Sequence, residues 1–135
     1  MTPEGKAATE RGLLSTSVFI AQETWRARAS LPAMAAVSIV SLAELHLGVL
    51  LTEDPHVRAQ RLRTLSSVEA LFQPLPVDAA VARTFAELVA EARRQGRRPK
   101  IMDTWIAATA VTHGLPVYTQ DKDFRAIPRA HVIRI

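Results

Sequence analysis

The sequence predicts one α/β domain: a short, mostly parallel, twisted sheet with helices on both faces. Short β-rich runs alternate with helix-permissive segments along the chain, which is the arrangement of β–α units. The 135 residues are enough for one domain, and 48% of them are hydrophobic, which is enough for a real core. With 5 Gly and 8 Pro, a disordered or collagen-like chain is excluded.

Two strand–helix units are expected first, after a polar stretch at residues 1–11 that lacks periodicity and suggests a flexible tail. The folded domain is therefore expected over 12–135. The run LLSTSVFI is rich in β-forming residues, and the segment after it permits a helix until Leu31-Pro32. In the second unit, apolar residues recur with the spacing of one helical face. The elements expected here are a strand at 13–20, a helix at 21–29, a strand at 37–40 and a helix at 41–51.

The second half of the chain adds three helices and three strands. Pro55 opens an amphipathic helix with a basic side, and Asp78 caps a long helix that follows a proline-interrupted strand at 71–77. The next helix is expected over 101–113, where Gly114 stops it. The remaining elements are a strand at 116–120, a turn at 121–124 and a final strand at 131–135.

Composition limits the kinds of site that the chain can carry. There are no cysteines, and the 4 His include no closely spaced helical pair, so we expect oxygen ligands and Mg²⁺ or Mn²⁺ for any metal. The net charge of +4 is compatible with a nucleic acid partner without demonstrating one. The longest apolar stretch is interrupted by Glu44 and His46, and no signal peptide is evident, so a cytoplasmic protein without a membrane span is expected.

Three carboxylates are expected at one edge of the sheet. Glu44 lies early in the helix after the second strand, Asp103 near the start of a later helix, and Asp121 directly after a strand. Each has a structural explanation: a capping box from Ser41 to Glu44, a helix dipole at Asp103, and turn chemistry at Asp121. Together they come from three β–α units that meet at the carboxyl ends of the strands, where like charges are commonly relieved by a divalent cation.

Three sequence blocks surround these acids: LLSTSVFI at 13–20, SIVSLAELHLGVL at 38–50 and IMDTWIAATAVTHGLPVYTQDKDF at 101–124. They resemble the PIN-domain ribonucleases, especially the VapC toxins of bacterial VapBC toxin–antitoxin systems, and the resemblance covers about residues 13–135. It implies a PIN-like three-layer sandwich. It also implies that Glu44, Asp103 and Asp121 fill three of the family's four acidic positions. The supporting polar groups that it implies are Ser17, Thr119 and Asp123.

The first acidic position departs from the family pattern. The family has an Asp-Thr-Ser-Val type of sequence on the first strand, and here Ser15 stands at the matching position. A hydroxyl supplies no negative charge, so we expect weaker metal binding and a slow or inactive enzyme. Glu23 lies more than two helical turns into the next segment, and we do not expect it to replace the acid.

The resemblance implies metal-assisted hydrolysis of an RNA phosphodiester, leaving 3′-hydroxyl and 5′-phosphate ends. The implied target is tRNA or rRNA. The implied partners are a second copy of the chain, giving a homodimer, and a VapB-like antitoxin whose carboxyl-terminal segment occupies the active-site groove. Apolar residues at Leu47, Val49, Leu50 and Leu62 are more numerous than a small core needs and are compatible with dimer burial.

A basic run precedes Asp103. It either forms a solvated helix end that stabilises the helix dipole, or clamps the phosphates of RNA, and both functions are compatible. The RNA-binding candidates are Arg94, Arg97, Arg98 and Lys100. Trp105 could stack on a base, although a packing role is at least as well supported.

Two other functions stay open. A nuclease-dead PIN module could bind RNA or sequester an antitoxin. A receiver-like phosphoacceptor domain would also gather acids at strand ends, but the chain lacks an Asp at the end of the third strand and a well-placed Lys.

Overall fold

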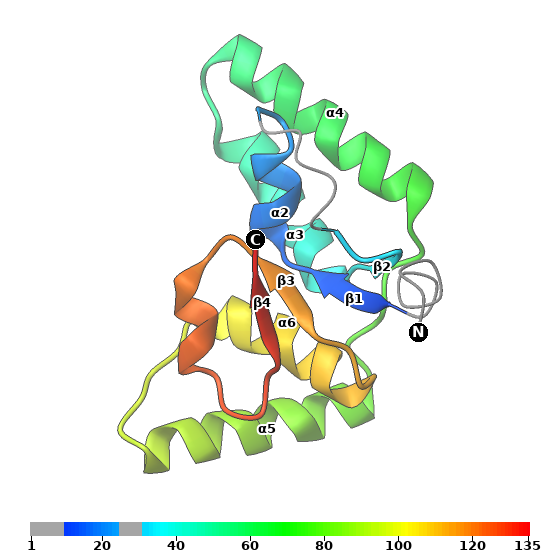
Figure 1. Ribbon diagram of the computed structural model, residues 1–135. Helices are drawn as coiled ribbons and strands as arrows, with labels where there is room; N and C mark the ends of the chain where they lie inside the picture. The colour runs from blue at the N-terminus through cyan, green and yellow to red at the C-terminus, as the bar shows by residue number, and fades with distance from the viewer. Residues whose placement is uncertain (1–9, 25–30) are drawn as a thin grey trace.

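The computed structural model describes residues 10–24 and 31–135 (Figure 1). Its strands are β1 (Arg11–Leu14), β2 (Met34–Ala36), β3 (Val117–Thr119) and β4 (Val132–Arg134). Its helices are α2 (Thr16–Ala21), α3 (Ile39–Leu51), α4 (Pro55–Leu71), α5 (Ala79–Arg94), α6 (Ile101–Thr112) and the 3-10 helix η2 (Lys122–Ala126).

The four strands form one parallel sheet in the order β2-β1-β3-β4. Leu13 on β1 is in register with Ala36 on one side and with Val117 on the other. The chain first moves outward from β1 to β2 and then returns across β1 to begin β3. The strand order therefore reverses between β1 and β3, and ligands of parallel sheets bind at the carboxyl ends of the strands beside such a reversal.

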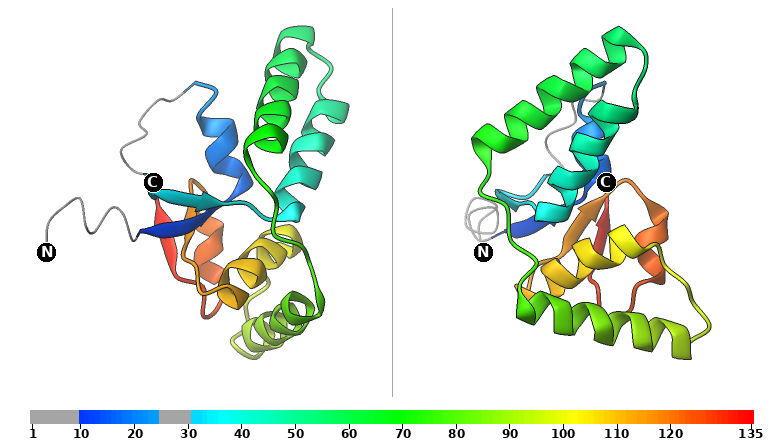
Figure 2. Two further views of the ribbon diagram at one scale, coloured as in Figure 1. Left: turned by 90° about the vertical axis from the view of Figure 1, so that its right-hand side faces the viewer. Right: turned by 180° about the vertical axis from the view of Figure 1, so that it is seen from behind.

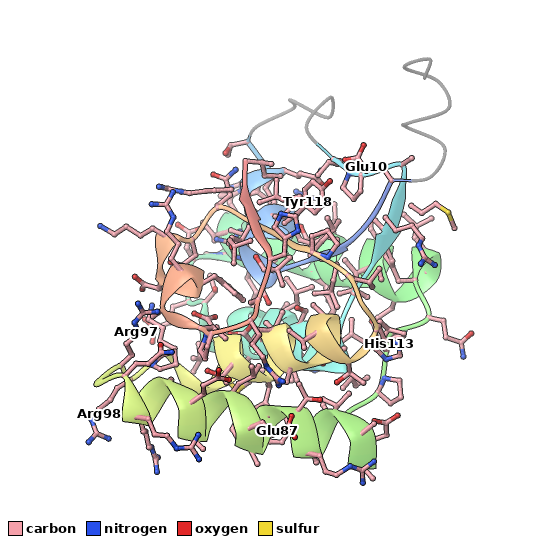
Figure 3. All side chains as sticks on the ribbon, turned by 60° about the horizontal axis from the view of Figure 1, so that its bottom comes forward. Glu10, Glu87, Arg97, Arg98, His113 and Tyr118 are labelled. Carbon is pink, nitrogen blue, oxygen red and sulfur yellow. The ribbon has the colours of Figure 1, made fainter. Side chains whose placement is uncertain are left out.

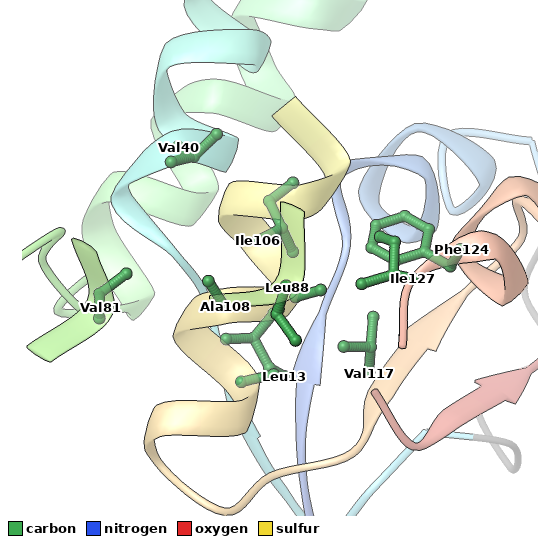
Figure 4. Close-up of a cluster of buried hydrophobic side chains, with 11 residues drawn as sticks. Leu13, Val40, Val81, Leu88, Ile106, Ala108, Val117, Phe124 and Ile127 are labelled. Carbon is green, nitrogen blue, oxygen red and sulfur yellow. The ribbon is translucent and has the colours of Figure 1, made fainter. Parts of the chain in front are cut away.

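Each face of the sheet carries its own hydrophobic core, because successive side chains of a strand point to opposite faces. Leu13 and Val117 pack with α5 and α6 in one core (Figure 4). Leu14 and Tyr118 pack with α2, α3 and α4 in the other. The sheet consequently lies between two helical layers, as the views in Figure 2 show, which confirms the predicted fold class.

Several predicted boundaries were wrong in the first half of the chain. The strand predicted at 13–20 ends at Leu14, and the helix α2 begins at Thr16 instead of 21. Part of the helix predicted at 21–29 lies outside the described residues. The strand predicted at 37–40 corresponds to β2 at Met34–Ala36, since Ser38 caps α3 by accepting a hydrogen bond from the Val40 amide at 3.1 Å. Tertiary packing outweighs the β propensity of these residues.

The strand predicted at 71–77 is also wrong. Within it, only Leu75 bridges to another segment, pairing with Ser38 beyond the end of β2. Proline residues on both sides of Leu75 limit the ladder hydrogen bonds available there. The first strand, β1, begins at Arg11, the last residue of the expected tail, and residues 1–9 lie outside the described part of the chain.

The helices of the second half agree with the predictions. Asp54 caps α4 at Pro55, and the Asp78 carboxylate accepts a hydrogen bond from the Val81 amide at 3.0 Å at the start of α5. Helix α6 ends before Gly114, whose φ of 67° is a conformation that glycine adopts without strain. Among the described helices, none is both long and apolar enough to cross a membrane.

Candidate active site

The predicted site residues come from both helical layers. Asp103 lies in the first turn of α6, and Asp121 is the residue before η2, two positions after β3. Glu44 lies in the second turn of α3 on the other face of the sheet. The carboxyl ends of the two central strands, β1 and β3, therefore lie next to both helical layers, as the topology predicts.

Glu44 does not form the predicted capping box. Helix α3 begins at Ile39, two residues earlier than expected, and is capped by Ser38, so Ser41 lies within the helix and its hydroxyl is not a cap. Glu44 instead accepts a hydrogen bond through Oε1 from the Thr16 hydroxyl on α2, at 2.6 Å. Thr16 Oγ1 also lies 3.0 Å from the Ser41 Oγ. A residue adjacent to the first acidic position thus fixes the orientation of Glu44.

A buried hydroxyl cluster occupies the end of β1 and β3. Ser15, which is 1% exposed, donates from Oγ to the Thr119 Oγ1 at 2.8 Å, and the Ser17 Oγ lies 2.9 Å from the Ser15 Oγ. The Ser17 Oγ accepts from the Gln120 amide at 3.0 Å, and Thr119 Oγ1 accepts from the Asp121 amide at 3.0 Å. This cluster satisfies its own hydrogen bonds and fixes the backbone that carries Asp121.

Asp103 is the electrostatic centre of the site. Burial, followed by the negative charges of Asp121 and Glu44, raises the pKa of Asp103 to about 6, while Lys100 acts in the opposite direction. Its Oδ2 atom is buried and has no hydrogen-bond partner among the described residues. A carboxylate oxygen left in this state is costly unless a cation reaches it.

The carboxylates do not form a closed metal cage. Among residues 10–24 and 31–135, no three His, Asp or Glu side chains are arranged so that they hold a metal ion directly. Magnesium nevertheless takes only one or two carboxylates and retains several waters, and Asp103 Oδ2 is an oxygen in need of a cation. The oxygen of Asp103, with the charges of Glu44 and Asp121 acting on it, is therefore chemically suited to a hard cation such as Mg²⁺ or Mn²⁺.

Glu23, considered for the missing acid, lies elsewhere. Its carboxylate pairs with Arg61 and accepts from the Thr64 hydroxyl at 2.6 Å, and both partners belong to α4. Its side chain is 6% exposed and serves to attach the segment after α2 to that helix. Trp105 stacks on Phe85 with ring centroids 3.6 Å apart and planes 6° apart, which gives it a packing role between α5 and α6.

Basic residues flank the acids on one side. Arg94 ends α5, Arg97 and Arg98 follow in the loop, and all three are exposed (Figure 3). Lys100 lies 3.1 Å through Nζ from Asp123 Oδ2, and this carboxylate raises the pKa of Lys100. The backbone amide of Asp123 donates to Asp121 Oδ1 at 2.8 Å. Asp121, predicted as a catalytic acid, and Asp123, predicted as a supporting acid, therefore share one turn.

Three residues beside the site were not predicted from the sequence: Thr16, Lys122 and Arg125. Thr16 could have been found from its position after Ser15, because a helix that begins there turns its hydroxyl toward the neighbouring helix. Lys122 and Arg125 could have been found from their places within and just after the acidic turn Asp121–Asp123, a segment that was considered only for its acids.

The protein is therefore an α/β domain with a parallel sheet and an anionic site at the carboxyl ends of the strands, where the strand order reverses. The PIN domain family model matches residues 13–130, so the chain belongs to the PIN-domain family. It is 48% identical to Ribonuclease VapC5 of Mycobacterium tuberculosis over 126 residues, covering 92% of this chain and 93% of that protein. It is 44% identical to Ribonuclease VapC4 of the same organism, covering 93% and 97%.

A solved structure supports the same relationship. The crystal structure of VapBC-5 from Mycobacterium tuberculosis, described as a member of the VapBC family of toxin–antitoxin systems, matches with a TM-score of 0.81. Sequence identity to that chain is 47%, and the match covers 93% of this chain and 97% of that one. The predicted resemblance to VapC-type PIN domains is thereby confirmed.

Proposed function

We propose that this chain is a VapC-type endoribonuclease toxin of a VapBC toxin–antitoxin system, dependent on Mg²⁺ or Mn²⁺ and acting in the cytoplasm. The proposed reaction hydrolyses an RNA phosphodiester, in tRNA or rRNA, to 3′-hydroxyl and 5′-phosphate ends. One observation carries the proposal: Asp103 has a buried oxygen with no hydrogen-bond partner among the described residues, it lies in the field of Asp121 and Glu44, and the chain is 48% identical to Ribonuclease VapC5.

The divalent cation, when bound, would lower the pKa of a water and stabilise the charge that develops on the phosphate. The chain's own residues prepare for this. Asp103 supplies an oxygen for which residues 10–24 and 31–135 offer no competing hydrogen bond, and Glu44 is held in one orientation by Thr16. Asp121 is fixed through its backbone by Thr119. Preorganised groups of this kind avoid reorganisation during the reaction.

Ser15 lowers the expected activity. It occupies the end of β1, its amide donates to the Tyr118 carbonyl at 2.9 Å, and its hydroxyl is already bonded to Thr119. A neutral side chain at this position leaves the site with one negative charge fewer than an aspartate would give. The same observation favours a second candidate function, a nuclease-dead PIN module that binds RNA or antitoxin without cutting RNA.

Cleavage of a structured RNA with Mg²⁺ or Mn²⁺ separates the two functions. The comparison uses the natural chain, Ser15→Asp, and Ser15→Asp combined with Asp103→Asn. We expect slow cleavage by the natural chain, faster cleavage by Ser15→Asp and none by the double variant. If Ser15→Asp is silent while it still binds RNA, the enzymatic function is wrong and the binding module is supported.

An antitoxin and a second copy of the chain are the proposed partners. The support is the pairing of the VapC-5 relative with an antitoxin in its solved VapBC structure and an exposed apolar surface on α3 and α4. Leu47, Leu50 and Leu62 are each exposed by half or more, whereas Val49, predicted to belong to the same surface, is buried in the core. Sedimentation of the isolated chain would test the homodimer.

A further inference from the structure

A basic cleft of about 500 Å³ lies beside the acidic site, between the loop after α5 and the 3-10 helix η2. Figures 1 and 3 show the end of α5 and η2 on the same side of the molecule. The charged residues that line the cleft are four cations and a single acid: Arg98, Lys100, Lys122, Arg125 and Asp123.

The elements that build the cleft also build the acidic site. Lys100 is the residue before α6, and Asp103 lies in the first turn of that helix. Asp121 is the residue before η2, and the cleft residues Lys122 and Arg125 lie on η2. The start of α6 and the start of η2 therefore each carry both an acid of the site and a cation of the cleft, so the cleft lies next to the site.

The cations are available to a ligand. Arg98, Lys122 and Arg125 are exposed, and of the four cations only Lys100 lies within 4.0 Å of a carboxylate in the described part of the chain. That pair joins Lys100 to Asp123, whose side chains are 66% and 46% exposed. Exposed ion pairs contribute little free energy, so a phosphate oxygen can replace Asp123 on Lys100 at low cost.

We propose that this cleft binds a backbone phosphate of single-stranded RNA next to the phosphate that is cut. Lys122 and Arg125 are the principal ligands of that phosphate, and Lys100 stays paired with Asp123 until RNA binds. The inference rests on the proposed function, because it takes the acidic site as the place of cleavage. Two arginines and two lysines suit a polyanionic backbone. Phosphate contacts position a nucleic acid without reading its bases, so binding here fixes the strand without selecting its sequence.

The test measures binding without cleavage. A fluorescent single-stranded RNA of about 12 nucleotides is titrated with the full chain in EDTA at several salt concentrations, and anisotropy gives Kd. We expect Lys122→Ala combined with Arg125→Ala to weaken binding by about tenfold at low salt and to lower the slope of log Kd against log salt by about one to two.

The matched control is Arg58→Ala combined with Arg63→Ala. Both residues are exposed on α4, far from η2 in Figure 1, and the control changes net charge by the same amount. It should alter the slope by much less than the cleft variant. Equal effects of the two double variants, or no effect of the cleft variant, would overturn the inference and leave only general attraction between opposite charges.

A second variant moves binding in the opposite direction, which loss of folding cannot do. Asp123→Asn releases Lys100 and removes the one acid in the cleft, so we expect RNA to bind about threefold or more tightly. Unchanged or weaker binding contradicts the role given to Asp123.

The failure of this inference is distinguishable from failure of the proposed function. Cleavage by Ser15→Asp with unchanged RNA binding by the cleft variant refutes the cleft alone. Specific RNA binding without cleavage refutes the nuclease alone.

Discussion

Two halves of the candidate site differ in how their polar groups are satisfied. At the ends of β1 and β3, the hydroxyls of Ser15, Ser17 and Thr119 bond to each other and to two backbone amides. On α6, Asp103 presents a buried oxygen that no donor in the described residues reaches, and burial together with the negative charges of Asp121, Glu44 and Asp123 raises its pKa. The hydroxyl half satisfies its own hydrogen bonds, whereas in the carboxylate half the negative charges that act on Asp103 outnumber the one cation, Lys100.

The difference indicates which half determines function in this chain. A neutral, fully bonded cluster supports the fold and orients Asp121, but it draws no ligand to the site. A carboxylate with an unpaired oxygen and a raised pKa is typical of functional sites. Ser15, which the resemblance to PIN-domain ribonucleases places at an acidic position, belongs to the hydroxyl half in this chain.

The largest expected effect is on metal affinity when the carboxylate half is removed. Asp103→Asn deletes the proposed direct ligand, so Mn²⁺ affinity should fall by more than about 100-fold, beyond the loss typical of an outer-shell change. Calorimetric titration with Mn²⁺ measures this. Asp78→Asn, which alters a helix cap remote from the site, is the control and should keep the natural affinity. Unchanged affinity in Asp103→Asn would mean that the metal binds elsewhere.

Ser15→Asp converts the hydroxyl half into a carboxylate half. The added negative charge should tighten Mn²⁺ binding by about tenfold, because cation affinity follows the charge of the ligands. It should also lower the melting temperature of the metal-free chain, since a new carboxylate joins Asp103 and the bond from Ser15 to Thr119 is lost. Scanning calorimetry with EDTA and with Mn²⁺ gives both effects. A variant that is destabilised equally in both conditions contradicts the account.

Stability should depend on pH through Asp103. Its pKa is raised from 3.8 to about 6 in the folded chain, so between these values the folded state binds a proton that the unfolded state has released. The free energy of unfolding consequently falls as pH rises through this window. Above it, the ionised group costs on the order of 1–2 kcal/mol, allowing for its partial exposure.

Asp103→Asn removes that cost. In EDTA, the variant should be more stable than the natural chain at about pH 7.5, and the difference should shrink toward zero near pH 4. Urea unfolding at both pH values measures the free energies. A gain in stability of the same size at both values would show that it does not come from ionisation of Asp103.

The smallest expected effect concerns Thr16, which links the two halves. Thr16→Val leaves Glu44 without its 2.6 Å hydrogen bond, so Mn²⁺ affinity should fall about threefold to tenfold, and Thr16→Ser should retain it. Thr84→Val removes a comparable partly buried hydroxyl between α5 and α6 and serves as the control for packing. Equal losses of metal affinity in Thr16→Val and Thr84→Val would assign Thr16 a structural role only.

The sequence was sufficient for the fold class and for the helices that begin or end at strong local signals. Asp54 and Asp78 cap the helices that follow them by accepting hydrogen bonds from backbone amides two or three residues away, and Gly114 adopts a positive φ after α6, so none of the three needs a distant partner. The early boundaries were wrong because Thr16–Ile20 and Ile39–Val40 are rich in β-branched and aromatic residues but lie in helices that pack against other helices, α2 against α3 and α4, and α3 against α6.

The sequence predicted that the three acids lie near one another, but it did not predict their contacts. Strand–helix alternation brings Asp103, Asp121 and Glu44 to one edge of the sheet, and the charge coupling at Asp103 agrees with that. The partner of Glu44 was mispredicted because a capping box is defined within one helix, whereas Thr16 belongs to another. Lys122 and Arg125 form a cleft only because the loop after α5 lies against η2, and no local pattern encodes that packing.

Diffraction from crystals grown with Mn²⁺, recorded at a wavelength where manganese scatters anomalously, tests the central claim most directly. The account predicts an anomalous peak with Asp103 Oδ2 as a direct ligand at about 2.1 Å and with Glu44 and Asp121 around it, directly or through water. A manganese peak remote from Asp103, or a donor from the protein already bonded to Oδ2 in a metal-free centre, would contradict it.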